Sequence, residues 1–237
     1  MNIKVSRFKG ATTRAAMCSM LKRDLAKVKD KRVLEIGCGS WDYAKNILER
    51  NGCSWFGIEP IDLGKNNLTF LRGSVGDLPL HNETFDLVLC NQSMEHWFEY
   101  GVSFDEALKE INRVLKPNGT LMINVPIHIH GHPIFLRGNM KKIKNIFAKD
   151  MWSFVLFERC IPSEDHLGWR KIGISGWQSK VGYPSWFMPN HKKAFSHILN
   201  IHVKKINRTS VRSLANSEYR QFVVITRFIK EMILGRL

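Results

Sequence analysis

The 237-residue sequence lacks several features that would place it in a familiar class of protein. It has no run of about 18 apolar residues, so it predicts no membrane-spanning helix. The N-terminal stretch MNIKVSRFKG lacks the continuous apolar segment of a secretory signal. No two cysteines form a CxxC pair, which argues against a zinc site or a disulfide framework and favours reduced thiols in a cytoplasmic protein. The five cysteines are Cys18, Cys38, Cys53, Cys90 and Cys160.

Acidic side chains are scarce at both ends of the chain, and the formal net charge is +15. Residues 1–30 hold 8 basic and 2 acidic side chains, residues 31–126 hold 9 and 13, and residues 127–237 hold 19 and 6. A basic surface attracts phosphates, sugar acids, nucleic acid or anionic lipid headgroups, or it serves only as a solvated exterior. The charge therefore leaves the class of partner open.

The sequence also has no internal repeat and no low-complexity segment. Short runs that are apolar on both faces alternate with amphipathic segments, as expected for a parallel sheet that helices cover on both sides. Ser103 and Glu106 have the spacing of a capping box, which predicts the start of a helix. We predict helices over 8–30, 42–52 and 103–119, and strands over 31–37, 53–60, 68–75, 85–91 and 120–126.

The alternation stops in the segment 127–190, which is rich in tryptophan, histidine and basic residues. We expect an inserted lid here, after the fifth strand, because aromatic faces and cationic side chains suit an anionic acceptor. The segment 191–237 then completes one domain, with a helix over 191–200 and strands over 201–206 and 219–228. The lid residues of interest are Trp152, Trp169, Trp177 and Trp186, which also suit a small core of the lid, and Arg137, Arg159, Arg170 and Lys171.

The stretch VLEIGCGSW, residues 33–41, predicts a buried strand that ends in a glycine turn. Glycines let a backbone approach a ligand closely, and the following helix offers its N-terminus. The lysine of a phosphate-binding P-loop is absent, and Asp42 stands where a dinucleotide fingerprint has its third glycine. An acid there repels a pyrophosphate but suits the cationic S-adenosylmethionine. Glu59, 20 residues after Gly39, can accept hydrogen bonds from both ribose hydroxyls.

Four motifs in order resemble those of a class I S-adenosylmethionine-dependent methyltransferase of the small "type 11" kind. The quoted motifs are VLEIGCGSWDYA, FGIEP, GSVGDLPLHNETFDLVLCNQSMEH and EINRVLKPNGTLMINVP, all within residues 31–126. The resemblance implies a Rossmann-like sheet of seven strands, mostly parallel, with helices on both faces. It also implies that the last strand, over 219–228, is antiparallel. S-adenosylmethionine is the cofactor that it implies.

The resemblance implies a set of cofactor-binding residues. Glu59 would hold the ribose, Ser74 and Val75 would meet the adenine, and Asn91 would face the methionine end through its backbone. The methionine and ribose side would be lined by Glu35, Gly37, Cys38 and Gly39. The family usually has Asp at the position of Ser74, and the nearby Asp77 is a possible substitute.

The family usually has Gly at the position of Trp41. This side chain either packs under the N-terminal helix or lines the acceptor side of the cofactor site, and we favour packing.

Histidine is the natural base for removing a proton from an acceptor hydroxyl near neutral pH. His96 follows the fourth strand, with Glu95 beside it, and serves either as a base or as a packed residue. His128, His130 and His132 follow the fifth strand. They suit a base or substrate contact, a structural turn or, on a continued strand, a metal site. We take His96, His128 and His130 as catalytic candidates and expect no metal.

Three classes of acceptor remain. We favour O-methylation of a small anionic acceptor, such as a phosphorylated or nucleotide-linked sugar for surface polysaccharide. An RNA methyltransferase is the alternative, although no RNA-binding module is recognisable. A membrane-surface enzyme is a weaker alternative, because residues 227–237 suit an interfacial helix, and a non-catalytic S-adenosylmethionine-binding protein is another. The sequence leaves the oligomeric state open.

Overall fold

The computed structural model describes residues 3–8, 13–64, 69–148, 150–162 and 197–206. Several predictions concern residues outside these ranges and are not taken further. They are most of the lid with Arg170, Lys171, Trp169, Trp177 and Trp186, the strand over 219–228 and the interfacial helix over 227–237. All the helices and strands described below belong to one compact unit, Met1–Lys205.

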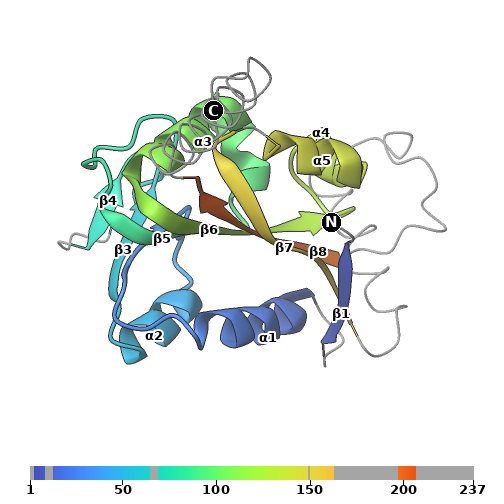
Figure 1. Ribbon diagram of the computed structural model, residues 1–237, viewed down its shortest axis with the longest axis horizontal. Coiled ribbons are helices and arrows are strands. Elements are labelled where there is room, and N and C mark those ends of the chain that lie inside the picture. The colour runs from blue at the N-terminus through green and yellow to red at the C-terminus, as the bar shows by residue number, and fades with distance from the viewer. Residues whose placement is uncertain (1–2, 9–12, 65–68, 149, 163–196, 207–237) are drawn as a thin grey trace, which may run out of the picture. The chain divides into compact units, whose positions relative to one another are not determined.

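The core of this unit is an eight-stranded sheet with the strand order β1-β7-β8-β6-β5-β2-β3-β4 (Figure 1). Every neighbouring pair of strands is parallel except the two pairs that β8 makes with β6 and β7, which are antiparallel. The strands are β1 Lys4–Phe8, β2 Arg32–Ile36, β3 Ser54–Glu59, β4 Phe70–Arg72, β5 Phe85–Asn91, β6 Leu115–Ile127, β7 Trp152–Pro162 and β8 His197–Lys205. The predicted mixed α/β fold with one antiparallel strand is therefore confirmed.

Among the described residues, the antiparallel strand is β8, at 197–205, whereas the predicted strand over 219–228 lies outside them. Two details of the prediction are wrong. The predicted helix over 191–200 is wrong over its described residues, because His197–Asn200 belong to the strand β8. The sheet also has an eighth strand, β1, which the sequence pattern did not indicate because its side chains are exposed or half-buried and lack an apolar run.

The strand β7 lies inside the segment expected to form a lid. It pairs with β8 and with β1 and contributes the buried side chains of Trp152 and Phe157 to the core. Residues 152–162 are thus part of the sheet. Trp152 is a core residue and does not belong to a lid.

Helices cover both faces of the sheet (Figure 1). On one face, α1 Thr13–Leu25 and α2 Tyr43–Arg50 bury Leu21, Leu25 and Leu48 against the strands. On the other face lie α3 Phe104–Val114 and the short helices α4 Pro133–Leu136 and α5 Met140–Ile146. A 3-10 helix, η1 Met94–Tyr100, follows β5. The sheet therefore has a hydrophobic core on each face, as its doubly apolar strands predicted.

The helix α3 shows how local sequence fixes an element. Ser103 Oγ accepts from the backbone N–H of Glu106, and the Glu106 carboxylate accepts from the backbone N–H of Ser103. This capping box satisfies amide donors that a helix start leaves unpaired. The predicted apolar stripe is buried, and the helix ends at Val114, where β6 begins.

A charged cluster joins α1 to β7 and β8 on the face of the sheet that α1 and α2 cover. Arg23 Nη2 lies 2.6 Å from Glu158 Oε2, and Asn200 Nδ2 donates to Asp24 Oδ2 over 2.8 Å. Ser6 of β1 also donates to the fully buried Glu158 carboxylate. Burial alone would raise the pKa of Glu158, but hydrogen bonds from Arg23, Ser6 and Asn200 lower that pKa to about 2. The cluster therefore links four elements through one buried anion.

None of the described helices is long and apolar enough to cross a membrane.

Candidate functional site

The carboxyl ends of β2, β3 and β5 surround a cavity of about 330 Å³. In an open parallel sheet, ligands bind at this edge because loops and helix starts converge there. The cavity is lined by Ile36, Gly37, Ile58, Glu59, Pro60, Gly73, Ser74, Val75, Gln92, Ser93, His96, Trp97, Glu99, Tyr100 and Val102.

The glycine turn after β2 forms one wall. Gly37 and Gly39 have φ angles of 69° and 54°, a backbone conformation that glycine adopts without strain. A Cβ on Gly37 would also collide with the side chain of Ser93. Ser93 Oγ donates to the carbonyl of Ile36 over 2.8 Å, so β5 and the turn are joined directly. This position therefore requires glycine for both conformation and space.

Glu59, the last residue of β3, faces the glycine turn. Its Oε2 accepts from the backbone N–H of Gly39 over 2.9 Å. Because Glu59 also lines the cavity, one carboxylate holds the turn and remains available to a ligand. The structure thus brings together Gly37, Gly39 and Glu59, as predicted.

The next wall follows β4. Ser74 and Val75 line the cavity, whereas Asp77 does not. The backbone N–H of Asp77 bonds to the Ser74 carbonyl, so the two residues close a tight turn. The side chain placed at the cavity is therefore that of Ser74, and Asp77 is not a substitute for it at the cavity wall.

Three predicted cofactor residues lie away from the cavity wall. The carboxylate of Glu35 is buried under the sheet, where it accepts from Trp55 Nε1 over 2.8 Å, and burial raises its pKa to about 7. Cys38 packs in the core with α1 and α2. Asn91 ends β5, but the residues after it, Gln92 and Ser93, line the cavity. Strand side chains alternate between faces, and the sequence alone did not show which members of these motifs turn inward.

One wall of the cavity was not predicted from the sequence. Trp97, Glu99 and Tyr100 of η1 line it together with the predicted His96. The available signal was their position directly after a buried strand, within QSMEHWFEY. A 3-10 helix is too short to give a periodic pattern, so the inward-facing residues could not be selected.

His96 is the catalytic candidate that reaches the cavity. Its Nδ1 lies 2.8 Å from Glu99 Oε1. Its ring stacks on that of His130, with the ring centroids 5.0 Å apart and the planes at 19°. Burial, aided by His96, lowers the pKa of His130 to about 4, which keeps this imidazole neutral at physiological pH.

The predicted histidine trio does not continue a strand. β6 ends at Ile127, and the segment 128–132 turns back toward η1. His128 Nδ1 lies 2.7 Å from the carbonyl of Leu136, and His132 Nδ1 accepts from the backbone N–H of Ile134 at the start of α4. His128 and His132 therefore shape this turn, and neither lines the cavity.

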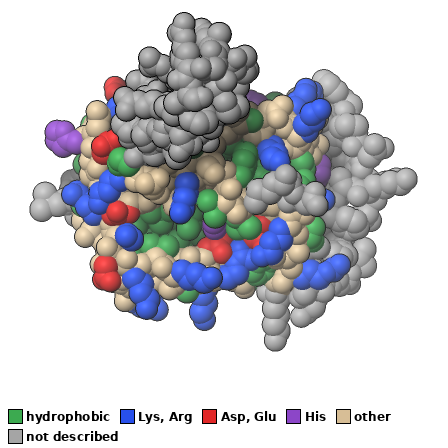
Figure 2. Space-filling view, viewed as in Figure 1, with side chains coloured by type: hydrophobic (Ala, Val, Ile, Leu, Met, Phe, Trp, Pro, Cys, Tyr) green, Lys and Arg blue, Asp and Glu red, His purple; other side chains and the backbone are tan. Residues whose placement is uncertain are grey.

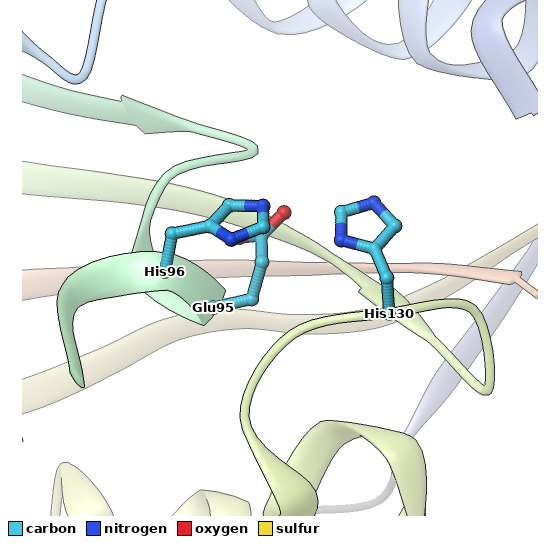
Figure 3. Close-up of side chains that lie close together, drawn as sticks. All are labelled: Glu95, His96 and His130. Carbon is cyan, nitrogen blue, oxygen red and sulfur yellow. The ribbon is translucent and has the colours of Figure 1, made fainter. Parts of the chain in front are cut away.

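Glu95, next to His96 in the chain, is fully buried, with no accessible surface. Neither of its carboxylate oxygens has a hydrogen-bond partner among the described residues. Burial raises its pKa to about 8. Ligand atoms of Glu95, His96 and His130 lie within 4.8 Å of one another, and Figure 3 shows the two imidazole rings side by side with the carboxylate next to them.

Trp41 lies outside the cavity wall and packs beside α1. Its ring stacks on Tyr43 with centroids 5.2 Å apart, and the guanidinium of Arg14 lies 5.2 Å from the ring centroid. The Tyr43 hydroxyl in turn donates to the carbonyl of Cys18 in α1. These contacts support the packing alternative.

The described basic residues of the expected lid also lie away from the cavity wall. Arg159 is a residue of β7, and its Nε donates to His197 Nε2 over 3.2 Å. Arg137 directly follows α4. Neither residue lines the cavity.

Comparison with known proteins agrees with this geometry. Residues 34–123 match the family model described as "Methyltransferase domain". An uncharacterized methyltransferase-like protein of Schizosaccharomyces pombe is 36% identical over 96 residues, which cover 38% of this chain and 36% of that protein. A demethylmenaquinone methyltransferase of Staphylococcus carnosus is 26% identical over 160 residues, covering 59% and 65% of the two chains.

The chain spans about a third of the length of the first curated relatives that it matches. The fold is similar to that of geranyl diphosphate C-methyltransferase from Streptomyces coelicolor A3(2), solved with S-adenosyl-L-homocysteine. The TM-score is 0.58 at 12% identity, over 81% of this chain and 77% of that one. Residues 34–123 are thus similar to a methyltransferase domain, and the sheet that contains them has the fold of the solved methyltransferase.

Proposed function

We propose that this protein transfers the methyl group of S-adenosylmethionine to a hydroxyl oxygen of a small anionic acceptor. A phosphorylated or nucleotide-linked sugar that serves as a precursor of surface polysaccharide is the acceptor that we favour. The observation that carries the cofactor part is the Glu59 carboxylate, which lines the cavity while it holds the N–H of Gly39.

The residues present fit this cofactor. Glu59 can accept hydrogen bonds from ribose hydroxyls, and the backbone at Gly39, where a Cβ would meet no atom within 4 Å, permits close approach of the methionine part. Ser74 and Val75 lie where an adenine ring would meet the loop after β4. S-adenosylmethionine supplies an electrophilic methyl group on a sulfonium.

In the proposed reaction, a lone pair of the acceptor oxygen forms a bond to the methyl carbon. The electrons of the breaking carbon–sulfur bond remain on sulfur, which becomes a neutral thioether. The acceptor proton leaves to a base, and His96 is the histidine that the cavity presents for this contact. The chain's main contribution is to align the acceptor oxygen with the methyl group.

The anionic acceptor is supported by charge. Residues 127–237 carry 19 basic and 6 acidic side chains, whereas the cofactor core is mildly acidic. The similarity to a demethylmenaquinone methyltransferase favours a second candidate acceptor, a quinone-type molecule at a membrane surface. The anionic acceptor and the quinone-type acceptor differ in charge, so an experiment can distinguish them.

The cofactor proposal predicts that Glu59→Gln weakens binding of S-adenosylmethionine by about 10- to 100-fold, since hydrogen bonds to a charged group contribute about 1.5–3 kcal/mol. Isothermal titration calorimetry measures this change. Glu49→Gln is the matched control, because Glu49 is exposed on α2 and lines no part of the cavity. Wild-type protein that binds NAD instead, or unchanged affinity in Glu59→Gln, would contradict the proposal.

The acceptor is identified by incubating the protein with methyl-labelled S-adenosylmethionine and three acceptor classes. These are sugar phosphates and nucleotide sugars, quinones presented in vesicles, and RNA. We expect label in the first class, in a product with a base-stable ether linkage. Label found only in quinone or RNA would overturn the acceptor class and leave the cofactor assignment intact.

A further inference from the structure

We propose that Glu95, His96 and His130 form a binding site for a divalent transition-metal ion beside the cofactor cavity. The ligand atoms of these three residues lie within 4.8 Å of one another. The site was not expected from the sequence, where the three histidines after β6 suggested a different set. It rests on side-chain geometry, and a metal ion on His96 Nε2 would take over from His96 the activation of the acceptor hydroxyl in the proposed methyl transfer.

The buried carboxylate of Glu95 is the first observation. It has no exposed surface, and neither oxygen has a hydrogen-bond partner among the described residues. A buried carboxylate without partners is costly, and such a group in a folded protein calls for an ion or a water. A cation placed between Glu95 and the two imidazoles satisfies it (Figure 3).

The fold brings His130 to this carboxylate through a glycine. Gly131 has a φ of 86°, and a Cβ there would collide with Glu95. The backbone N–H of His132 also donates to the Glu95 carbonyl over 2.8 Å. The turn after β6 is therefore pressed against η1, and this close approach places His130 next to His96.

Glu99 orients one of the ligands. His96 Nδ1 lies 2.8 Å from Glu99 Oε1, so the proton of a neutral imidazole is held on Nδ1 and Nε2 has a free lone pair for a metal. A carboxylate behind a metal-binding histidine is a common arrangement that fixes the ring and its tautomer.

The ligand set selects the class of cation. Two imidazoles with one carboxylate suit Zn²⁺, Mn²⁺, Co²⁺ or Fe²⁺, whereas Mg²⁺ and Ca²⁺ prefer oxygen ligands. Bonds of about 2.1 Å in tetrahedral geometry separate ligand atoms by about 3.4 Å. The ligand atoms lie within 4.8 Å of one another, so the three side chains must approach one another by up to about 1.4 Å around a bound ion.

Three protein ligands leave coordination positions open, which is the arrangement of catalytic and substrate-binding metals. Because His96 also lines the cavity, the open positions lie toward the space for the acceptor. The bound cation would then hold an acceptor oxygen and lower the pKa of a hydroxyl bound to it.

Metal titration of the purified, tag-free protein tests the site without any cofactor present. After treatment with a chelator and its removal, Zn²⁺, Mn²⁺ and Co²⁺ are titrated by calorimetry, and Co²⁺ also by visible absorption. We expect one ion per chain and Co²⁺ bands typical of nitrogen and oxygen ligands. The absence of stoichiometric binding by all three ions would overturn the proposal.

Three variants assign the ligands. Glu95→Gln, which preserves volume, and His130→Ala should each weaken metal binding by more than about 100-fold, and Glu99→Gln by about 10- to 100-fold. His81→Ala is the matched control, because His81 is an exposed histidine outside the cavity. Binding that survives in Glu95→Gln and His130→Ala, or that is lost equally in His81→Ala, would place the ion elsewhere. Circular dichroism checks that each variant is folded, and Glu95→Gln replaces the buried carboxyl group by an amide of the same size, so its fold should be retained.

Discussion

At the scale of single residues, Trp41 shows how a departure from a family pattern acquires a structural role. The ring is held between Tyr43 and Arg14, and Tyr43 is in turn bonded to α1. This chain uses a large side chain to join the turn after β2 to the N-terminal helix. The cofactor cavity is left open because the ring does not line it.

We expect Trp41→Ala to lower the free energy of unfolding by about 1–3 kcal/mol, because it removes an aromatic pair and partly buried apolar surface. Affinity for S-adenosylmethionine should change less than about threefold. Urea denaturation and calorimetry measure the two quantities. Trp41→Phe should restore most of the stability, and a large loss of affinity without loss of stability would mean that the ring contacts the cofactor.

Cavity residues whose place depends on the backbone alone were predictable from the sequence. Residues whose place depends on the direction of the side chain were not. Gly37 and Glu59 stand at strand ends, where position alone places them at the cavity. Glu35 and Cys38 lie in the same motif but turn into the core, since a strand or turn presents its neighbours in different directions. His130 was selected as a base, but its contacts with His96 and Glu95 depend on a turn that no periodic pattern signals.

At the scale of elements, the strands with continuous apolar runs were predictable, and β1 and β7 were not. β5 matches its predicted range of 85–91 because it is buried on both faces. β7 contains Ser153, Glu158 and Arg159, which break an apolar run, so its place in the sheet could not be seen. Its buried charge is satisfied by side chains of β1, α1 and β8, which are distant in the sequence.

The cluster around Glu158 predicts a loss of stability in acid. The pKa of Glu158 is lowered in the folded protein, so its contribution is complete above its unfolded value of about 4.3 and is lost as the pH falls toward 2. The contribution amounts to about 3 kcal/mol. Urea denaturation of wild type between pH 5 and about 2 should show this decline, as the linkage requires.

Glu158→Gln is the comparison variant for this experiment. It should be less stable than wild type at pH 7 by about 2–5 kcal/mol, because Arg23 loses the buried one of its two anionic partners, Glu158 and Asp24. Its stability should fall less than that of wild type between pH 5 and 2. Equal slopes for both proteins would show that other carboxylates cause the acid sensitivity.

At the scale of the whole molecule, the positive charge is unevenly spread. Figure 2 shows lysine and arginine side chains along the edge of the molecule where Figure 1 places α1 and α2. The cofactor cavity, at the carboxyl ends of the strands, is instead lined by acidic Glu59 and Glu99. Charge of this kind attracts polyanions in general and carries no sequence specificity.

We therefore expect RNA to bind only weakly, and no more tightly than heparin, at about 0.15 M salt. Electrophoretic mobility shifts over a salt series measure this. Heparin is the control because it offers anionic groups without bases. Tight binding that favours RNA over heparin, with a steep salt dependence, would support the RNA methyltransferase alternative over the small acceptor.

The pairing of β1 with β7 has a consequence for how the chain reaches its native state. Lys4 lies opposite Glu158, so the earliest strand in the sequence has its partner more than half a chain length away. A ribosome must release β7 before β1 can dock, and contacts between such distant segments form slowly. We therefore expect β1 to pair last, after the other strands of the sheet have assembled. Native-state hydrogen exchange would then find the amides of β1 among the first to open.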